Sequence, residues 1–149
     1  MPLRLARFTA AFIAVLPLLA CSGTIAEPSK VTSSPIASLA IETDVVWHLH
    51  SIVGADGSLL PIEDPSVFTL MLTGDGKVSA RADCNRASGG YSISGQTLSI
   101  GPIASTRAYC ATAPVDQRFL MLLGGENVVT ASGETFELSS PRGTLRFRR

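Results

Sequence analysis

Charged residues are scarce in this chain, at 16% of the sequence, and neither sign predominates, because 12 lysines and arginines are balanced by 12 aspartates and glutamates. Removal of the N-terminal segment with Arg4 and Arg7 leaves 10 basic residues against the same 12 acidic ones, a net charge near -2. Nucleic-acid-binding domains carry a basic patch that neutralises phosphates. The composition therefore predicts no nucleic-acid partner.

Residues that commonly carry catalysis are also few, with two histidines and three cysteines. The chain has no Cys-x-x-Cys pair, phosphate-binding glycine loop, nucleophile elbow or metalloprotease motif. His48 and His50 stand two positions apart on an expected strand and could share a metal, but no third ligand has a matching spacing. The alternative is two polar residues on a sheet face or beneath a loop. We therefore expect no enzymatic activity, no cofactor and no metal.

The N-terminus has the layout of a secretory signal, with Arg4 and Arg7 before an apolar run over residues 8–19. That run is shorter than the roughly 20 residues that a membrane-spanning helix needs. Residues 18–21, Leu-Leu-Ala-Cys, resemble the bacterial lipobox, which predicts a signal peptide over residues 1–20 and a lipid on Cys21. The alternative is an ordinary secreted protein with an incidental cysteine.

Residue 22 and the composition after it predict where the protein lies. Bacterial sorting uses Asp after the lipidated cysteine to retain a lipoprotein in the inner membrane, and this chain has Ser22. We therefore expect a lipid-anchored protein of the bacterial outer membrane, facing the periplasm. Residues 21–43 are rich in Ser, Thr, Ala and Pro and predict a flexible tether. Residues 44–149 are enough for one domain with its own core.

The pattern after Asp44 is mostly that of strands. Residues 45–53 carry Trp47, Leu49 and Val53 on one side and Val46, His48, His50 and Ile52 on the other, which predicts a central strand that is buried on both faces. Two hairpins are predicted next, residues 67–72 with 77–82 across Thr73-Gly74-Asp75-Gly76, and residues 91–94 with 97–100 across Gly95-Gln96.

One helix is predicted after Pro114, because Val115, Phe119, Leu122 and Leu123 form an apolar stripe and two glycines follow. Asp116 lies in its first turn, where a carboxylate favours the helix dipole. Short strands are expected over residues 127–131, 135–138 and 144–148. The chain is therefore assigned to the α+β class, a mainly antiparallel sheet with one helix packed on it, and the pattern leaves the strand order open.

Several groups of residues, in order and spacing, resemble the META domain, the family of HslJ-like bacterial lipoproteins. They lie at residues 47–52, 81–86, 89–91, 105–110, 119–120, 138 and 145–147, and the motif residues are Trp47, Asp83, Cys84, Asn85, Gly90, Tyr91, Thr106 and Cys110. The resemblance implies a sheet-rich domain with one helix in envelope proteins linked to stress and antibiotic tolerance. It implies no catalytic activity and no established ligand.

Two positions depart from the family pattern. Many members have Gly where this chain has Asp83, and many have Met where it has Ala108. Because Asp reaches positive φ less readily than Gly, the first departure could change the backbone geometry at Cys84.

Cys84 and Cys110 are expected to form a disulfide, because a lipid would occupy Cys21 and the periplasm is oxidising. A redox-active pair or a reactive thiol is the alternative, and the lack of a Cys-x-x-Cys motif argues against it.

The residues thus favour a non-enzymatic envelope lipoprotein that binds an unknown envelope protein or supports the envelope under stress. A second interpretation is a periplasmic inhibitor of a cell-wall hydrolase such as lysozyme, which predicts a protruding loop. A third, a hydrolase or redox enzyme, would need His48 or His50 close to Cys84 or Asp83.

Overall fold

The computed structural model describes residues 41–149, and β-strands make up most of its regular structure. The predicted signal peptide, Cys21 and all but the end of the predicted tether lie outside the described residues. The elements are β1 (Trp47–Gly54), β2 (Leu59–Pro61), the 3-10 turn η1 (Pro65–Val67), β3 (Phe68–Leu72), β4 (Lys77–Ala82), β5 (Asn85–Ser94), β6 (Thr97–Ile100), β7 (Ala104–Ser105), α1 (Val115–Leu123), β8 (Gly125–Ser132), β9 (Thr135–Ser140) and β10 (Gly143–Arg148).

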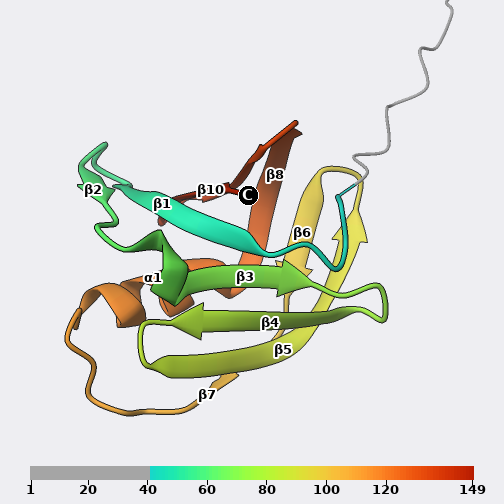
Figure 1. The fold of residues 1–149 in the computed structure, drawn as a ribbon. Helices are drawn as coiled ribbons and strands as arrows, with labels where there is room; N and C mark the ends of the chain where they lie inside the picture. The colour runs from blue at the N-terminus through green and yellow to red at the C-terminus, as the bar shows by residue number, and fades with distance from the viewer. Residues whose placement is uncertain (1–40) are drawn as a thin grey trace, which may run out of the picture. The chain divides into compact units, whose positions relative to one another are not determined.

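Eight of the ten strands form a closed antiparallel barrel (Figure 1). The order is β1-β3-β4-β5-β6-β8-β9-β10, and β10 pairs with β1 to close the ring. The short strands β2 and β7 add to the edges of β1 and β5. The predicted fold class is confirmed, and the structure supplies the strand order and the closure.

Both predicted hairpins are present. β3 pairs with β4 so that Leu70 faces Ala80, and β5 pairs with β6 so that Ile93 faces Leu98. β5 is longer than expected, because it begins at Asn85 and pairs with β4 along its first half. The residues around Cys84 therefore form the tight connection between two neighbouring strands.

The prediction that β1 is buried on both faces is wrong. The pairing of β1 with β10 shifts between Leu49 and Ser51, which marks a β-bulge. The bulge turns Ile52 inward, where it is 0% exposed, on the same side as Trp47 and Leu49. Val46, by contrast, is 46% exposed. The apparent two-sided pattern therefore comes from a break in the alternation of a strand with one buried face.

Core side chains occupy the barrel interior, and α1 packs across one end. Phe119 of α1 contacts Phe68 and Phe147 edge to face, with ring centroids 5.9 and 6.2 Å apart, and Trp47 stacks on Phe136 at 5.2 Å. Leu122 and Leu123 are buried as the helix pattern predicts. Phe119, Leu122 and Leu123 of α1 thus cover the end of the barrel at which the helix lies.

The helix is short, at nine residues from Val115 to Leu123. Within residues 41–149, no helix has both the length and the apolar character to cross a membrane.

Candidate functional site: a loop anchored beside the helix

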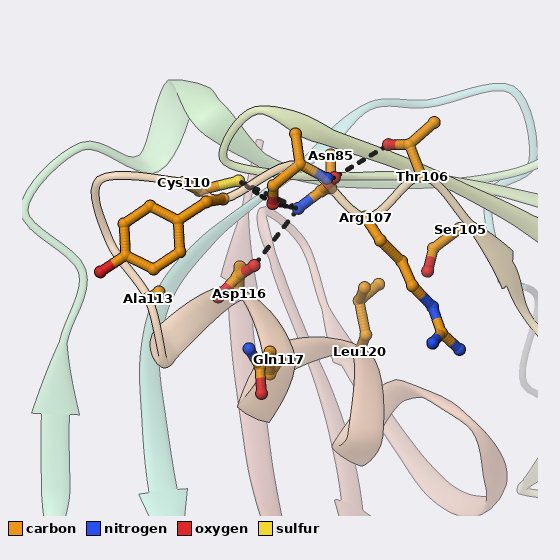
Figure 2. A pocket seen from close by; sticks show the side chains of 11 residues that line it. Asn85, Ser105, Thr106, Arg107, Cys110, Ala113, Asp116, Gln117 and Leu120 are labelled. Carbon is orange, nitrogen blue, oxygen red and sulfur yellow. Dashed lines mark hydrogen bonds between the residues drawn. The ribbon is translucent and has the colours of Figure 1, made fainter.

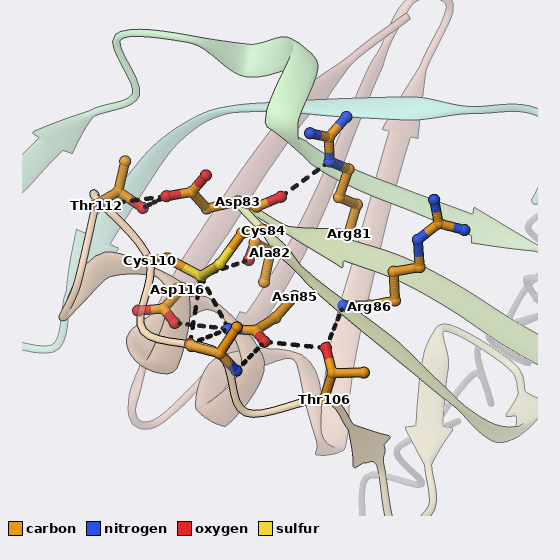
Figure 3. The surroundings of a disulfide bond; sticks show 11 residues. Arg81, Ala82, Asp83, Cys84, Asn85, Arg86, Thr106, Cys110, Thr112 and Asp116 are labelled. Atoms are coloured by element: carbon orange, nitrogen blue, oxygen red, sulfur yellow. Dashed lines mark hydrogen bonds between the residues drawn. A yellow bond between two sulfur atoms is a disulfide. The ribbon is translucent and has the colours of Figure 1, made fainter.

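The Cys84–Cys110 disulfide ties the β4–β5 connection to the segment that leads into α1 (Figure 3). The two Cα atoms lie 5.6 Å apart although the residues are separated by 26 positions in the sequence. The predicted disulfide is therefore present. We call the segment that it holds, residues 105–113, the anchored loop.

Asn85 provides a second tie to the anchored loop (Figures 2 and 3). Its side-chain oxygen accepts from the Thr106 hydroxyl at 2.9 Å and from the Ala108 N–H at 2.8 Å. Its NH2 group donates to the Ala108 carbonyl at 3.0 Å and to Cys110 Sγ at 2.9 Å. Because Asn85 is only 3% exposed, the loop replaces water as the partner of this amide.

Thr106 extends the same contact toward β5, because its N–H donates to the Arg86 carbonyl and its hydroxyl accepts from the Arg86 N–H, both at 3.0 Å. Asn85 thus bonds a segment that lies more than twenty positions away in the sequence.

Asp83 provides a third tie, at the other end of the loop. Its carboxylate accepts from the Thr112 N–H at 3.0 Å and from the Thr112 hydroxyl at 2.8 Å. Asp83 has a φ of 55°, the left-handed region that favours glycine. The backbone at this connection therefore has the conformation that glycine would adopt, while the aspartate adds two hydrogen bonds.

The motif residues predicted from the sequence fall into two groups. One group surrounds the anchored loop and consists of Asp83, Cys84, Asn85, Thr106 and Cys110. The other lies away from it, in the barrel wall and core, and consists of Trp47, Gly90 and Tyr91.

Tyr91 and Trp47 have structural contacts. The Tyr91 hydroxyl donates to the Thr73 carbonyl at 2.8 Å, which joins β5 to the β3–β4 turn. Burial raises the pKa of Tyr91 above its ordinary value of 10.0, and Asp44 and Asp75 raise this pKa further. Trp47 is buried against Phe136, and the Arg149 guanidinium lies 5.8 Å from its ring centroid.

The two histidines do not join the anchored loop. His48 Nδ1 lies 3.3 Å from the Pro65 carbonyl, beneath η1, and His50 is exposed. In the described residues, no three His, Cys, Asp or Glu side chains come together as metal ligands would. Among the described residues, neither histidine forms a hydrogen bond with Asn85 or Cys110.

A cleft of about 450 Å³ opens between the anchored loop and α1 (Figure 2). Its lining includes Asn85, Arg107, Tyr109, Asp116, Gln117 and Leu120. Tyr109, at 95% exposure, stands almost entirely in solvent. The loop thus combines a fixed backbone with exposed side chains beside a polar hollow.

Asp116 belongs to this site, although it was not predicted from the sequence as a site residue. It was assigned only to the first helical turn, yet it is 4% exposed. One carboxylate oxygen, Oδ2, accepts from the Asn85 NH2 group at 3.3 Å, and Oδ1 has no hydrogen-bond partner among the described residues. The signal was available, because Asp116 lies three positions before Phe119 on the buried face of the helix.

Comparison with solved structures supports the fold. An NMR structure of a protein from Burkholderia xenovorans is 26% identical, covers 72% of this chain and 82% of its own, and superposes with a TM-score of 0.59. A crystal structure of a DUF4847 family protein from Bacteroides vulgatus is 14% identical, covers 72% of this chain and 94% of its own, and has a TM-score of 0.53. The second likeness concerns the fold alone.

No curated protein matches the chain in sequence. The sequence profile of the META domain matches residues 39–149, which includes the whole barrel, the disulfide and the anchored loop. The chain therefore belongs to the META domain family.

Proposed function

We propose that this protein is a non-enzymatic binding module of the bacterial cell envelope, lipid-anchored through Cys21, and that it contacts an envelope protein through the anchored loop. The observation that carries this proposal is the contrast between a filled barrel interior and a tied loop that exposes Tyr109 at 95%. A large ligand inside the barrel would have to displace the core, so binding at the surface is favoured.

The three ties of the anchored loop support a binding role. The disulfide, the Asn85 bonds and the Asp83 bonds order the loop before any partner arrives. A loop that is already ordered loses less conformational entropy on binding. Tyr and Arg are also enriched among the residues that contribute most to binding at protein interfaces. Tyr109 and Arg107, both exposed, are therefore the proposed contact residues.

One feature of the sequence and one of the structure support the envelope location. The lipobox-like residues before Cys21 are expected in an exported lipoprotein. A disulfide between Cys84 and Cys110 suits an oxidising compartment such as the periplasm. The exported domain would then carry its contact loop outside the cytoplasm.

A capture experiment tests the proposal. The wild-type protein and an Arg107→Ala, Tyr109→Ala double variant are used to capture proteins from envelope extracts, and the captured proteins are identified by mass. Arg148→Ala, at an exposed position on β10, is the matched control for loss of a positive charge. We expect a partner that the wild type and the control retain and the double variant loses. Equal capture by all three proteins would contradict a role for the loop.

A second candidate, inhibition of a cell-wall hydrolase, is favoured by the position of Arg107 and Tyr109 on the same exposed loop. Lysozyme-type clefts contain two catalytic carboxyl groups, which a positively charged side chain complements. Addition of the protein to a lysozyme assay should then lower the rate of hydrolysis, and Arg107→Ala should relieve the inhibition. An unchanged rate with the wild-type protein would rule out this candidate for that enzyme.

A further inference from the structure

Asp116 places a carboxylate with a single hydrogen bond at the cleft beneath the anchored loop. The residue is 4% exposed and lines the cleft, and its Oδ1 has no partner within residues 41–149 (Figure 2). Buried carboxylates are costly unless they are hydrogen-bonded or paired with a cation. Here the single bond from Asn85 to Oδ2 satisfies half of the group. Oδ1 is itself enclosed by protein atoms, so the carboxylate has to rotate before a donor in the cleft reaches it. A positively charged donor would then be favoured most.

One residue in the lining, Arg107, carries the opposite charge. Arg107 is the sole cationic side chain and Asp116 the sole anionic one among the residues that line this cleft. Hydroxyl and amide groups of Ser105, Thr106 and Gln117 make up much of the remaining wall. A site with one fixed charge of each sign complements a ligand that carries both signs. Its volume of about 450 Å³ lies within the range of small-molecule sites, roughly 300–1,000 Å³.

The two charged side chains differ in mobility: Asp116 is buried in the protein, whereas Arg107 is exposed and can adjust to a ligand. The Asp116 carboxylate is held by one long bond from Asn85, at 3.3 Å, and rotation about its last side-chain torsion, which is broad in Asp, exchanges this bond for one to a donor in the cleft. Arg107 is exposed on the loop and can close over a bound carboxylate with two parallel N–H donors.

We propose that this cleft binds a zwitterionic amino acid or the free ends of a short peptide, with the ammonium group on Asp116 and the carboxylate on Arg107. The inference deepens the proposed function and rests on it, because it names the ligand chemistry of the same anchored loop. Tyr109 forms the exposed rim of the cleft and offers its ring to the ligand backbone.

Capped dipeptides test the two charge contacts separately. Binding of Ala-Ala, N-acetyl-Ala-Ala and Ala-Ala amide to the purified full-length protein is measured by calorimetry. Acetylation removes the ammonium charge and amidation removes the carboxylate. We expect each cap to weaken binding by about tenfold, because a charge-assisted bond is lost in each case.

Variants then assign each effect to a residue. Asp116→Asn should bind Ala-Ala and N-acetyl-Ala-Ala equally, and Arg107→Ala should bind Ala-Ala and its amide equally. Arg148→Ala should behave as the wild type. Thermal unfolding separates binding from folding, because Asp116→Asn removes a buried charge and should leave the Tm equal or higher. Since Arg107 is exposed, its variant tests the proposal even if Asp116→Asn fails to fold.

Equal binding of the free and capped dipeptides by the wild type, or no binding of any of the three, would overturn the inference. If the envelope capture experiment still yields a partner that depends on Arg107 and Tyr109, the proposed binding function stands and only the ligand chemistry falls. If both experiments give nothing, both proposals fail together.

Discussion

Asp83 adopts a backbone conformation in which side chains are unfavourable, and its carboxylate offsets the cost. Its φ of 55° lies in the left-handed region, where an L-residue costs roughly 1–2 kcal/mol and Asp or Asn somewhat less. Two hydrogen bonds from Thr112 to the carboxylate, at 3.0 and 2.8 Å, hold the start of the helix segment. Asp83 therefore adopts the backbone conformation that glycine would adopt and also accepts two hydrogen bonds, which glycine cannot do.

Substitution of Asp83 should give a ranked series of stabilities. Asp83→Asn keeps an acceptor and tolerates positive φ, so it should cost less than about 1 kcal/mol. Asp83→Gly keeps the backbone and loses both bonds, at about 1–2 kcal/mol, and Asp83→Ala loses both and adds strain, at about 2–3 kcal/mol. Urea unfolding measures the series. A glycine variant more stable than the wild type would show that the Thr112 bonds contribute little.

Tyr91 makes the free energy of unfolding fall at high pH. Because burial and then Asp44 and Asp75 raise the pKa of Tyr91 in the folded protein, the unfolded chain loses this proton first as the pH rises. The stability that Tyr91 contributes is complete below about pH 10 and is lost as the pH rises through the folded pKa. Tyr91→Phe should cost about 1 kcal/mol at neutral pH, through the lost bond to Thr73, and should flatten the decline above pH 10. Urea unfolding from pH 7 to pH 11 checks both effects.

Tyr109→Phe is the matched control for this measurement, because it removes the same hydroxyl from an exposed ring. A Tyr91→Phe profile that declines as steeply as the wild type would contradict the assignment to Tyr91.

At the scale of elements, the anchored loop is a segment with almost no regular structure that is held by side chains. Only β7, at Ala104–Ser105, pairs with the barrel, and the next regular element is α1 at Val115. The buried Asn85 amide is therefore central to the order of the loop. Asn85→Ala should cost about 2–4 kcal/mol, because it leaves the Ala108 backbone groups without their partner.

Proteolysis distinguishes loss of loop order from general destabilisation. Trypsin should cleave after Arg107 faster in Asn85→Ala than in the wild type under native conditions. Asn127→Ala is the matched control, because Asn127 is also buried and bonds the Leu123 carbonyl at 3.1 Å instead of the anchored loop. Equal cleavage after Arg107 in both variants would argue against a specific role of Asn85.

The disulfide also holds the anchored loop, and it stabilises the fold mainly by lowering the conformational entropy of the unfolded chain. A crosslink between residues separated by 26 positions stabilises by about 3.5 kcal/mol in the chain-entropy model. The Cys84→Ser, Cys110→Ser double variant should lose about that amount in urea unfolding, and reduction of the wild type should lower its stability to the same level. A much smaller loss would mean that the hydrogen bonds of Asn85 and Asp83 already restrict the loop.

At the scale of the whole molecule, the barrel closes where β1 ends and β10 begins. Gly54 faces Gly143 across this seam, and Gly143 has a φ of 145°. A Cβ atom at Gly143 would lie 2.5 Å from the Val53 carbonyl oxygen, closer than atoms can approach. At this end, next to Leu122 of α1, the barrel can close only because the backbones of β1 and β10 come into close contact at these glycines.

Gly143→Ala should lower the free energy of unfolding by about 2–4 kcal/mol, because both the contact with Val53 and the backbone conformation oppose it. Gly57→Ala is the matched control: Gly57 also has positive φ, at 81°, and a Cβ there would meet nothing within 4 Å. It should cost about 1 kcal/mol from the backbone alone. Equal losses in the two variants would show that the seam tolerates a side chain.

Local patterns predicted the local elements well. The turn residues between β3 and β4 and the apolar stripe of α1 act over a few positions, so each could be read without knowledge of the rest. β1 was the exception, since its bulge depends on pairing with β10 nearly a hundred positions later. The prediction from the sequence therefore placed Ile52 on the wrong face, because side chains alternate strictly between the two faces only in a strand without a bulge.

The sequence by itself determined the hairpins, the helix and the two cysteines that pair, because turn chemistry, side-chain periodicity and the small number of cysteines are properties of short segments or of composition. Only the tertiary structure decided that eight strands close into a barrel and that Asn85 and Asp116 meet beneath residues 105–113. Strand order and a buried polar contact join residues that are far apart in the chain. They depend on how the hydrophobic faces pack together, which no local pattern specifies.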